Sequence, residues 1–505
     1  MEHAQTKESV NELESGRAGS TVHVDLVPGT RTLLAGSSED LILMPQPSEH
    51  PDDPLNWGSL RRYTSYAIVC IYSFMVATVA LSTAVTYGAL IAEFGTTAQY
   101  LNIGTAISLL LVGVGDLFWY PLALHYGRRP VYIASCLLTG VAQIISATAQ
   151  TSSVFIGSRI LMGFFAAPFE QLPAVSVNDQ FFVHRRSYGI TLYVLAATLG
   201  SFLGPMATGF VVDGAGWRWV HWIFAIIMGG VTVLAFFFLE ETGYDRDVSL
   251  AVSSTVRSKP YTAKLSLITK LHPPQDFLNT MIEPLKLLVE PIVVWTAFLY
   301  GFGIAWLSIV AFTSNTIFQS PEYGYNFSFA SVGLAGLATL VGSVLILYIG
   351  GAGTDRFMIW RAHKNNGVME PESRIYAVFV AGPIMAAGLI LYGAGAAAGL
   401  HWMVPITGMG LVGAGIPISG EVALAYVTEC YSHKAGEAST AMITIRNIIA
   451  CAMLFATEPW IRHNGLRDTF IIMGVLCLVG FWSGALLIWK GKSCRRRSAR
   501  IWGLS

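Results

Sequence analysis

Residues 65–91 read SYAIVCIYSFMVATVALSTAVTYGALI, and this stretch carries no charged side chain. A helix rises about 1.5 Å per residue, so roughly 20 apolar residues are enough to cross the ~30 Å hydrocarbon core of a bilayer. The apolar residues form one long run instead of alternating with polar ones, as they would in the strands of a membrane barrel. The stretch therefore predicts a membrane-spanning helix.

Eleven further runs of the same kind follow along the chain. They lie at 101–124, 130–149, 154–178, 187–212, 219–239, 292–314, 328–350, 375–397, 402–429, 437–458 and 468–489. The 505-residue chain is 53% hydrophobic and 12% charged, whereas a typical soluble domain is about 25% charged. With zero formal net charge and no basic domain, a soluble, disordered or nucleic-acid-binding protein is excluded. We expect an all-α membrane protein with twelve transmembrane helices.

The positions of Lys and Arg predict the orientation of these helices. Loops on the side of the two tails hold fifteen of these residues, and the opposite loops hold three. Because cytoplasmic loops carry the excess of positive charge, both termini are expected to be cytoplasmic. We expect a multi-pass protein, most simply monomeric and in the plasma membrane, in contact with the lipid bilayer and with no nucleic acid.

The longest loop, 241–290, is polar and separates two sets of six spans. The predicted segments are a polar cytoplasmic tail at 1–62, a first six-helix bundle at 63–240, a cytoplasmic linker at 241–290, a second six-helix bundle at 291–490 and a basic cytoplasmic tail at 491–505. The halves repeat one pattern, because Glu170 and Asp179 in the fourth span correspond to Glu421 and Glu429 in the tenth. Such weak internal symmetry is typical of secondary transporters with a substrate site between the halves.

Short motifs along about residues 40–490 identify a family. They are Asp53-Pro54-Leu55-Asn56-Trp57, Tyr126-Gly127-Arg128-Arg129-Pro130, Arg159 with Gly163, Gly200-x-x-x-Gly204-Pro205-x-x-x-Gly209, Glu370-Pro371-Glu372, Ala435-Gly436-Glu437-Ala438, Arg446-Asn447 and Pro459-Trp460. With these motifs the chain resembles a fungal member of the major facilitator superfamily, of the twelve-span drug:proton antiporter type. The resemblance implies two pseudo-symmetric six-helix bundles, alternating access, and a relation to multidrug-resistance and secondary-metabolite efflux pumps. The first loop motif departs from the family, with Tyr120 and Leu124 where a Gly and an acid are usual.

Ionisable side chains inside spans are the first functional candidates, because placing them in hydrocarbon costs several kcal/mol. Counted from the expected cytoplasmic helix ends, Asp116, Glu170 and Arg446 lie roughly 14 Å deep and Glu421 about 10 Å deep. We expect these four to line a central cavity. Burial favours the protonated form of a carboxyl group, so Glu421, Glu170 or Asp116 is suited to carrying a coupled proton. The alternative is a structural ion pair, for example between Glu421 and Arg446.

Arg159 lies about 30 Å from the cytoplasmic end, which excludes direct contact with Asp116 or Glu170. The resemblance implies that this arginine takes part in proton transfer. The alternative is an arginine that snorkels to the outer surface.

Further charged residues lie at the cytoplasmic helix ends. Arg128 and Arg129 are placed to pair with Asp179, and Arg356 or Arg361 to pair with Glu429. The resemblance implies that such pairs close the cytoplasmic side and break during alternating access, whereas solvated charge near headgroups is the alternative. The implied gating residues are Gly127, Arg128, Arg129, Asp179, Asp355, Arg356 and Glu429.

The fifth span carries small residues at regular intervals. The resemblance makes Gly200, Gly204, Pro205 and Gly209 an antiporter-type helix motif, although close helix packing around a proline bend explains the spacing equally well. A sequon at Asn326 lies in a loop expected to face outward and predicts a glycoprotein; an unused sequon too close to the membrane is the alternative.

The motifs of membrane enzymes are missing from the sequence. It contains no HExxH, GxSxG, clustered histidine ligands or phosphate-binding glycine loop, so neither an enzyme, a metal nor a cofactor is expected. We expect a proton-coupled antiporter that exports small amphipathic organic molecules such as drugs, toxins or a fungal secondary metabolite. The alternative on the same fold is a proton-coupled uptake or polyamine carrier.

Overall fold

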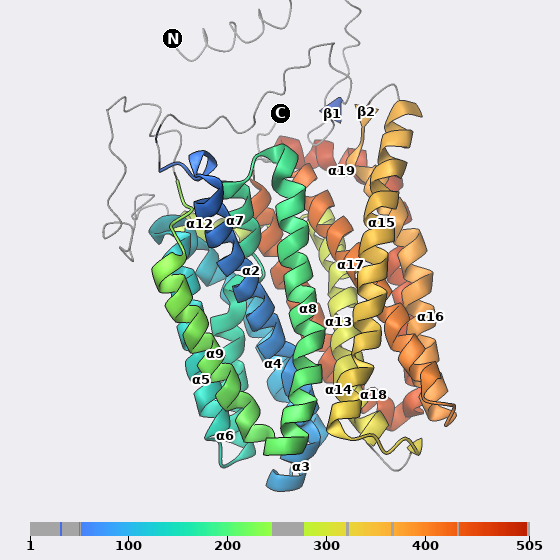
Figure 1. Cartoon of the computed structure of the whole chain (residues 1–505). Helices are drawn as coiled ribbons and strands as arrows, with labels where there is room; N and C mark the ends of the chain where they lie inside the picture. Colours follow the sequence, from blue (N-terminus) through green and yellow to red (C-terminus); the bar gives the residue numbers. More distant parts are fainter. Residues whose placement is uncertain are drawn as a thin grey trace, which may run out of the picture.

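The computed structural model describes residues 31–32, 50, 52–244, 277–319, 323–364, 368–431 and 434–501. Long helices run side by side along one common direction (Figure 1). The start of α2 and the whole of α19 lie at one end of this bundle, which we call the termini end, and α3 and α14 lie at the other, which we call the far end (Figure 1). The buried apolar side chains form one main cluster that contains residues of both halves of the chain.

The first half of the chain consists of helices joined by short turns. Its elements are η1 (Pro54–Asn56), α2 (Ser59–Ser82), η2 (Thr83–Thr86), α3 (Tyr87–Phe94), α4 (Ala98–Tyr126), α5 (Arg128–Ala147), α6 (Ser152–Ala166), η3 (Ala167–Phe169), α7 (Leu172–Gln180), α8 (Val183–Ala215) and α9 (Trp217–Phe238). Side-chain caps begin several of them, as where Thr97 accepts a hydrogen bond from the backbone of Tyr100 at the start of α4. A single glycine with positive φ, Gly216 (φ 87°), joins α8 to α9.

The second half repeats this organisation. Its elements are α12 (Phe277–Leu287), α13 (Pro291–Gln319), α14 (Phe329–Ala335), α15 (Leu337–Lys364), β2 (Val368–Met369), η6 (Pro371–Ala377), α16 (Val378–Ala397), α17 (Met403–Cys430), α18 (Ala435–Trp482) and α19 (Gly484–Ile501). The short strand β1 (Arg31–Thr32) pairs antiparallel with β2, with Arg31 opposite Met369. The regular secondary structure in the described part of the chain is therefore helical apart from this pairing of two-residue strands.

Eleven helical segments in the described ranges are long and apolar enough to cross a membrane. One of them, Ala435–Ser498, has 64 residues and is too long for a single crossing. Its helix α18 has a non-helical backbone at Gly465 (φ 77°, ψ 164°), which divides it into two arms. The first arm packs on α4 and α13, and the second on α16. The first arm is long enough to span by itself, the second continues past Ser483 into α19, and twelve crossings stays a prediction.

The basic tail expected from residue 491 is helical as far as Ile501, because α19 continues into it. Arg495 is buried, and its guanidinium donates two hydrogen bonds to Glu372, at 2.9 and 2.8 Å. This ion pair holds the tail helix against η6, and sequence position does not reveal the contact. In the expected linker, α12 occupies residues 277–287, and residues 245–276 lie outside the described part.

Candidate functional site

A buried arginine lies where the two halves of the chain meet. Arg446, in the first arm of α18, is 3% exposed. Its guanidinium forms an ion pair with Glu170 of the first half, and its central carbon lies 4.4 Å from the centroid of the Tyr300 ring in α13. A carboxylate and an aromatic face both stabilise a desolvated cation. The arginine is therefore held from both halves at once.

Asp116 of α4 adds a second carboxylate. The residue is 1% exposed and interacts electrostatically with Arg446. The two helices touch here, because the Thr444 hydroxyl donates to the Gly113 carbonyl at 3.1 Å and Gly113 leaves room for Asn447. Oδ2 of Asp116 has no hydrogen-bond partner in the described part of the chain. Glu170 is thus ion-paired with this guanidinium, and Asp116 is a second carboxylate near it without an ion pair of its own to Arg446 in the described part of the chain. We call Asp116, Glu170, Tyr300 and Arg446 the interface cluster.

Glu170 owes its position to a break in the fourth span. Pro168 in η3 and Pro173 in the first turn of α7 interrupt the ladder of helical hydrogen bonds on either side of it. A carbonyl just before the break, that of Phe164, accepts a hydrogen bond from the Trp119 indole at 2.9 Å. Broken helices of this kind are tolerated at membrane depth where protein surrounds them, and they recur at transport sites.

The interface cluster contains three of the four side chains expected to line a central cavity. Glu421 is the exception, since it is exposed on α17 whereas Asp116 is fully buried. The alternative of a structural ion pair between Arg446 and Glu421 named the wrong partner, because Arg446 forms its ion pair with Glu170. Sequence position gives the depth of a helical residue but not the direction in which it points about the helix axis.

Arg159 belongs to a separate polar group inside the first half. It is buried in α6 and donates a hydrogen bond to the Thr83 hydroxyl of η2. Its charge also acts on Tyr87 and on His221. The snorkelling alternative is therefore wrong, because the side chain points into the helix bundle and not to the outer surface.

Charged residues at the termini end of the first half form a compact group. Arg128 Nε lies 3.1 Å from Oδ2 of Asp179. The Glu241 carboxylate accepts hydrogen bonds from the backbone N–H groups of Arg128 and Arg129, at 2.8 and 3.0 Å, and so caps α5. Gly127 allows this turn with φ 105°, and a Cβ there would collide with Glu241. Arg129 is buried and donates to a backbone carbonyl of α9 at 2.5 Å. Glu241 was not among the predicted site residues; its signal in the sequence is its place two residues after the end of an expected span.

The second half holds a similar ion pair with a different partner from the one expected. Glu429 at the end of α17 accepts two hydrogen bonds from Arg374, at 2.7 and 3.0 Å. The expected pairing with Arg356 or Arg361 is therefore wrong. Arg374 lies two residues after the Glu-Pro-Glu motif at 370–372, and η6 places it beside α17. Arg356 is exposed in α15, and the side chain of Asp355 lies outside the described part.

The glycine motif of α8 packs against both halves. A Cβ on Gly200 would overlap the Phe74 carbonyl of α2, and one on Gly204 would lie 2.7 Å from the Ser82 hydroxyl oxygen. At Gly209 the neighbour is the carbonyl of Phe329 in α14 of the second half, at 2.5 Å. The Pro205 carbonyl likewise faces α14. This geometry matches the close-packing interpretation of the motif and places α8 between the halves.

Asn326 lies at the far end, in the turn before α14. Its side chain is exposed and its φ is 48°. Ser328, the third residue of the sequon, caps α14 by accepting a hydrogen bond from the Ser331 backbone at 3.2 Å. The acceptor side chain is therefore accessible, and its glycosylation stays a prediction.

Comparison with known proteins finds one family. The family model described as Major Facilitator Superfamily matches residues 67–454, more than half of the chain. An uncharacterised MFS-type transporter of Schizosaccharomyces pombe is 28% identical over 91% of this chain and 89% of its own. The efflux pump radE of Floropilus chiversii is 28% identical over 88% of this chain and 83% of its own.

Solved structures show the same fold. A D-xylose-proton symporter superposes with a TM-score of 0.60 at 15% identity, over 85% of this chain and 97% of its own. A POT family transporter in complex with 5-aminolevulinic acid superposes with a TM-score of 0.58 at 13% identity, over 84% of this chain and 96% of its own. At these identities the likeness concerns the fold alone.

Proposed function

The chain belongs to the Major Facilitator Superfamily, and on this premise we propose that it is a proton-coupled antiporter that exports small amphipathic organic molecules. As a member of that family it is a multi-pass membrane transporter of small molecules and not an enzyme. The proposed cargo is a drug, a toxin or a fungal secondary metabolite. The proposed location is the plasma membrane, with the termini end facing the cytoplasm, which the fifteen-to-three distribution of Lys and Arg supports.

The interface cluster is the observation that carries the proposal. Glu170 is ion-paired with the Arg446 guanidinium, and the buried Asp116 carboxyl group on the neighbouring helix is close enough to interact with it electrostatically. Desolvation raises the proton affinity of a buried carboxyl group, and a nearby cation lowers it. A small movement of Arg446 therefore changes the proton affinity of the two acids. We propose that Asp116 and Glu170 bind the exchanged proton. Because Arg446 lies in the second half and both acids in the first, movement of the halves changes proton affinity directly.

Contacts between the halves at both ends support alternating access. At the termini end the Gln171 amide donates to the Gly436 carbonyl at 3.3 Å. At the far end the Ala330 backbone N–H donates to Asp213 at 3.0 Å, and the Asn315 amide donates to the Ala84 carbonyl. Opening toward either side breaks one of these two sets of contacts. We propose that the Arg128–Asp179 and Arg374–Glu429 ion pairs stabilise closure of the termini end.

A proton-coupled uptake or polyamine carrier is the alternative. The D-xylose-proton symporter has the same fold, so the fold alone allows substrate and proton to move together. Export is favoured by the efflux pump among the sequence relatives. A guanidinium inside the interface cluster opposes the binding of a polycation, which would need several acids without a competing arginine.

Transport by the purified full chain in sealed vesicles tests this proposal. A panel of flat apolar and cationic compounds is offered under an imposed pH gradient, for wild type and for Asp116→Asn, Glu170→Gln and Glu421→Gln. We expect Asp116→Asn to reduce gradient-driven flux at least tenfold while substrate-for-substrate exchange without a gradient persists. Glu421→Gln is the control, because this residue is also an acid within a membrane-spanning helix but is exposed, on α17 of the second half.

Three outcomes contradict parts of the proposal. Unchanged gradient-driven flux in both Asp116→Asn and Glu170→Gln removes the interface cluster as the proton site. Loss of that flux in Glu421→Gln alone assigns the proton to α17. Substrate and protons that move in the same direction establish the uptake alternative.

A further inference from the structure

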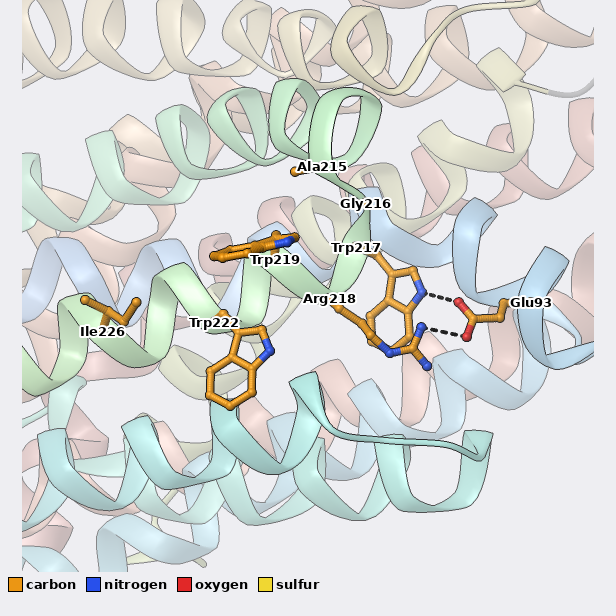
Figure 2. A pocket seen from close by; sticks show the side chains of 8 residues that line it. All are labelled: Glu93, Ala215, Gly216, Trp217, Arg218, Trp219, Trp222 and Ile226. Carbon is orange, nitrogen blue, oxygen red and sulfur yellow. Dashed lines mark hydrogen bonds and ion pairs between the residues drawn. The ribbon is translucent and has the colours of Figure 1, made fainter.

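A pocket opens on the far end of the first half, away from the interface cluster. It has a volume of ≈ 570 Å³ and lies between the end of α3 and the start of α9 (Figure 2). Figure 2 shows the side chains of Glu93, Trp217 and Arg218 grouped at one end of it, and those of Trp219, Trp222 and Ile226 along α9. The pocket therefore has a charged part and an apolar part.

The charged part is a rigid pair of opposite charges. Arg218 Nη1 lies 2.6 Å from Oε1 of Glu93, and the Trp217 indole donates to Oε2 of Glu93 at 2.7 Å. The Arg218 guanidinium also lies 4.4 Å from the Trp217 ring centroid and donates to the Ala149 carbonyl at 3.1 Å. Both charged side chains remain about two-fifths exposed, 39% for Arg218 and 41% for Glu93. Each carboxylate oxygen can accept a second hydrogen bond, and the guanidinium has further N–H donors.

The apolar part faces the hydrocarbon. Trp219, Trp222 and Ile226 are 53%, 37% and 67% exposed, although α9 is apolar enough to cross a membrane. They are spaced by three and four residues, so they share one face of the helix over about 10 Å of its length. Exposed apolar side chains on a membrane-spanning helix contact lipid, and tryptophans near its end mark the level of the headgroups. The pocket therefore begins at the headgroup level and continues toward the acyl chains.

We propose that this pocket binds one phospholipid with a zwitterionic phosphocholine headgroup. Arg218 binds the phosphate, since a guanidinium forks onto phosphate oxygens. The quaternary ammonium lies against the Glu93 carboxylate, at the end of the pocket opposite Ile226 (Figure 2), because opposite charges attract. The acyl chain then follows Trp222 and Ile226. A lipid with a net negative headgroup lacks the ammonium and places its charge beside Glu93, so the pocket disfavours it. This inference does not depend on the direction of transport or on the proton site.

Photocrosslinking of the full chain in nanodiscs tests the site. The probe is a phosphatidylcholine with a photoreactive acyl chain, and the labelled peptide is identified by mass spectrometry. We expect label on the peptide that contains residues 217–226, competed by unlabelled phosphatidylcholine at least tenfold better than by phosphatidylglycerol. Arg218→Gln is expected to reduce this label at least tenfold.

Two further variants keep the result decisive if Arg218→Gln fails to fold. Trp219→Ala removes an exposed ring that lines the pocket, and Trp482→Ala removes an equally exposed ring, 53% in both cases, on another helix. We expect the first to lower labelling of 217–226 at least threefold and the second to leave it unchanged. Equal competition by both lipids, equal effects of the two variants, or selective displacement by a sterol would overturn the proposal.

Discussion

The ion pair between Arg495 and Glu372 gives the sharpest test of how α19 packs against η6. Arg495 is 2% exposed, and its two hydrogen bonds to Glu372 anchor α19 to η6. A second anchor is the Ser498 hydroxyl, which donates to Glu290 at 2.5 Å. Arg495→Gln removes the positive charge and leaves the Glu372 carboxylate buried without its ion-pair partner. Breaking a buried pair in this way costs about 3–5 kcal/mol.

That cost translates into local opening of α19. Because every ~1.4 kcal/mol is a factor of ten, the opened population should rise by roughly 10²–10³-fold or somewhat more. Hydrogen exchange measured by mass spectrometry reports it as faster exchange of the amides of residues 484–501. Arg496→Gln is the matched control, since this neighbouring side chain is exposed and its loss should change exchange less than about threefold.

The double variant Glu372→Gln/Arg495→Gln separates a paired charge from simple loss of packing. Removing both partners avoids a buried unpaired charge, so the double variant should exchange more slowly than Arg495→Gln alone. The interpretation is refuted if Arg495→Gln and Arg496→Gln affect exchange of α19 equally, since a lipid-anchoring tail would behave in that way. It is also refuted if the double variant opens as much as the two single effects combined.

Three other predictions follow from contacts. Gly209→Val should hold the far end open, because the new side chain would meet a backbone carbonyl 2.5 Å away. Gly214→Val is the control, since a Cβ there meets nothing within 4 Å. Spin labels at the far ends of α8 and α14 should move apart only in the first variant. Arg374→Gln should slow transport severalfold, because it breaks the ion pair with Glu429 at the end of α17. Arg361→Gln should leave the rate unchanged, and initial transport rates in vesicles measure both variants. Asn326→Gln should abolish a glycan-dependent mobility shift on gels if that exposed asparagine is modified, and an identical shift in the variant would exclude the site.

The sequence alone predicts much of the fold because the membrane imposes a simple requirement. Every span must be an apolar run of sufficient length, and the structure begins and ends most helices within a few residues of the expected positions. The fourth span was correctly placed, but its break at Pro168 was not foreseen. Helix α15 also continues to Lys364, beyond the expected end at 350, because its polar last turns project past the apolar run.

The sequence predicts how deep a residue lies within its span, but it does not predict the direction in which the side chain points about the helix axis. Asp116 and Glu421 were both placed well inside their spans, yet one is buried against the other half and the other is exposed. Depth follows from counting residues along a helix, at a constant rise. Direction depends on the rotation of each helix against its neighbours, which the packing of the whole bundle sets.

Sequence therefore determined the membrane class, the expected sides of the loops and which charged residues lie within helices. Only the tertiary structure decided which of them meet: Glu170 with Arg446, Arg374 with Glu429, and Arg495 with Glu372. These partners are separated by more than fifty residues, so local pattern holds no information about them. Close helix approach contributes to this choice, as where Gly113 lets α4 pack against the segment of α18 that carries Arg446.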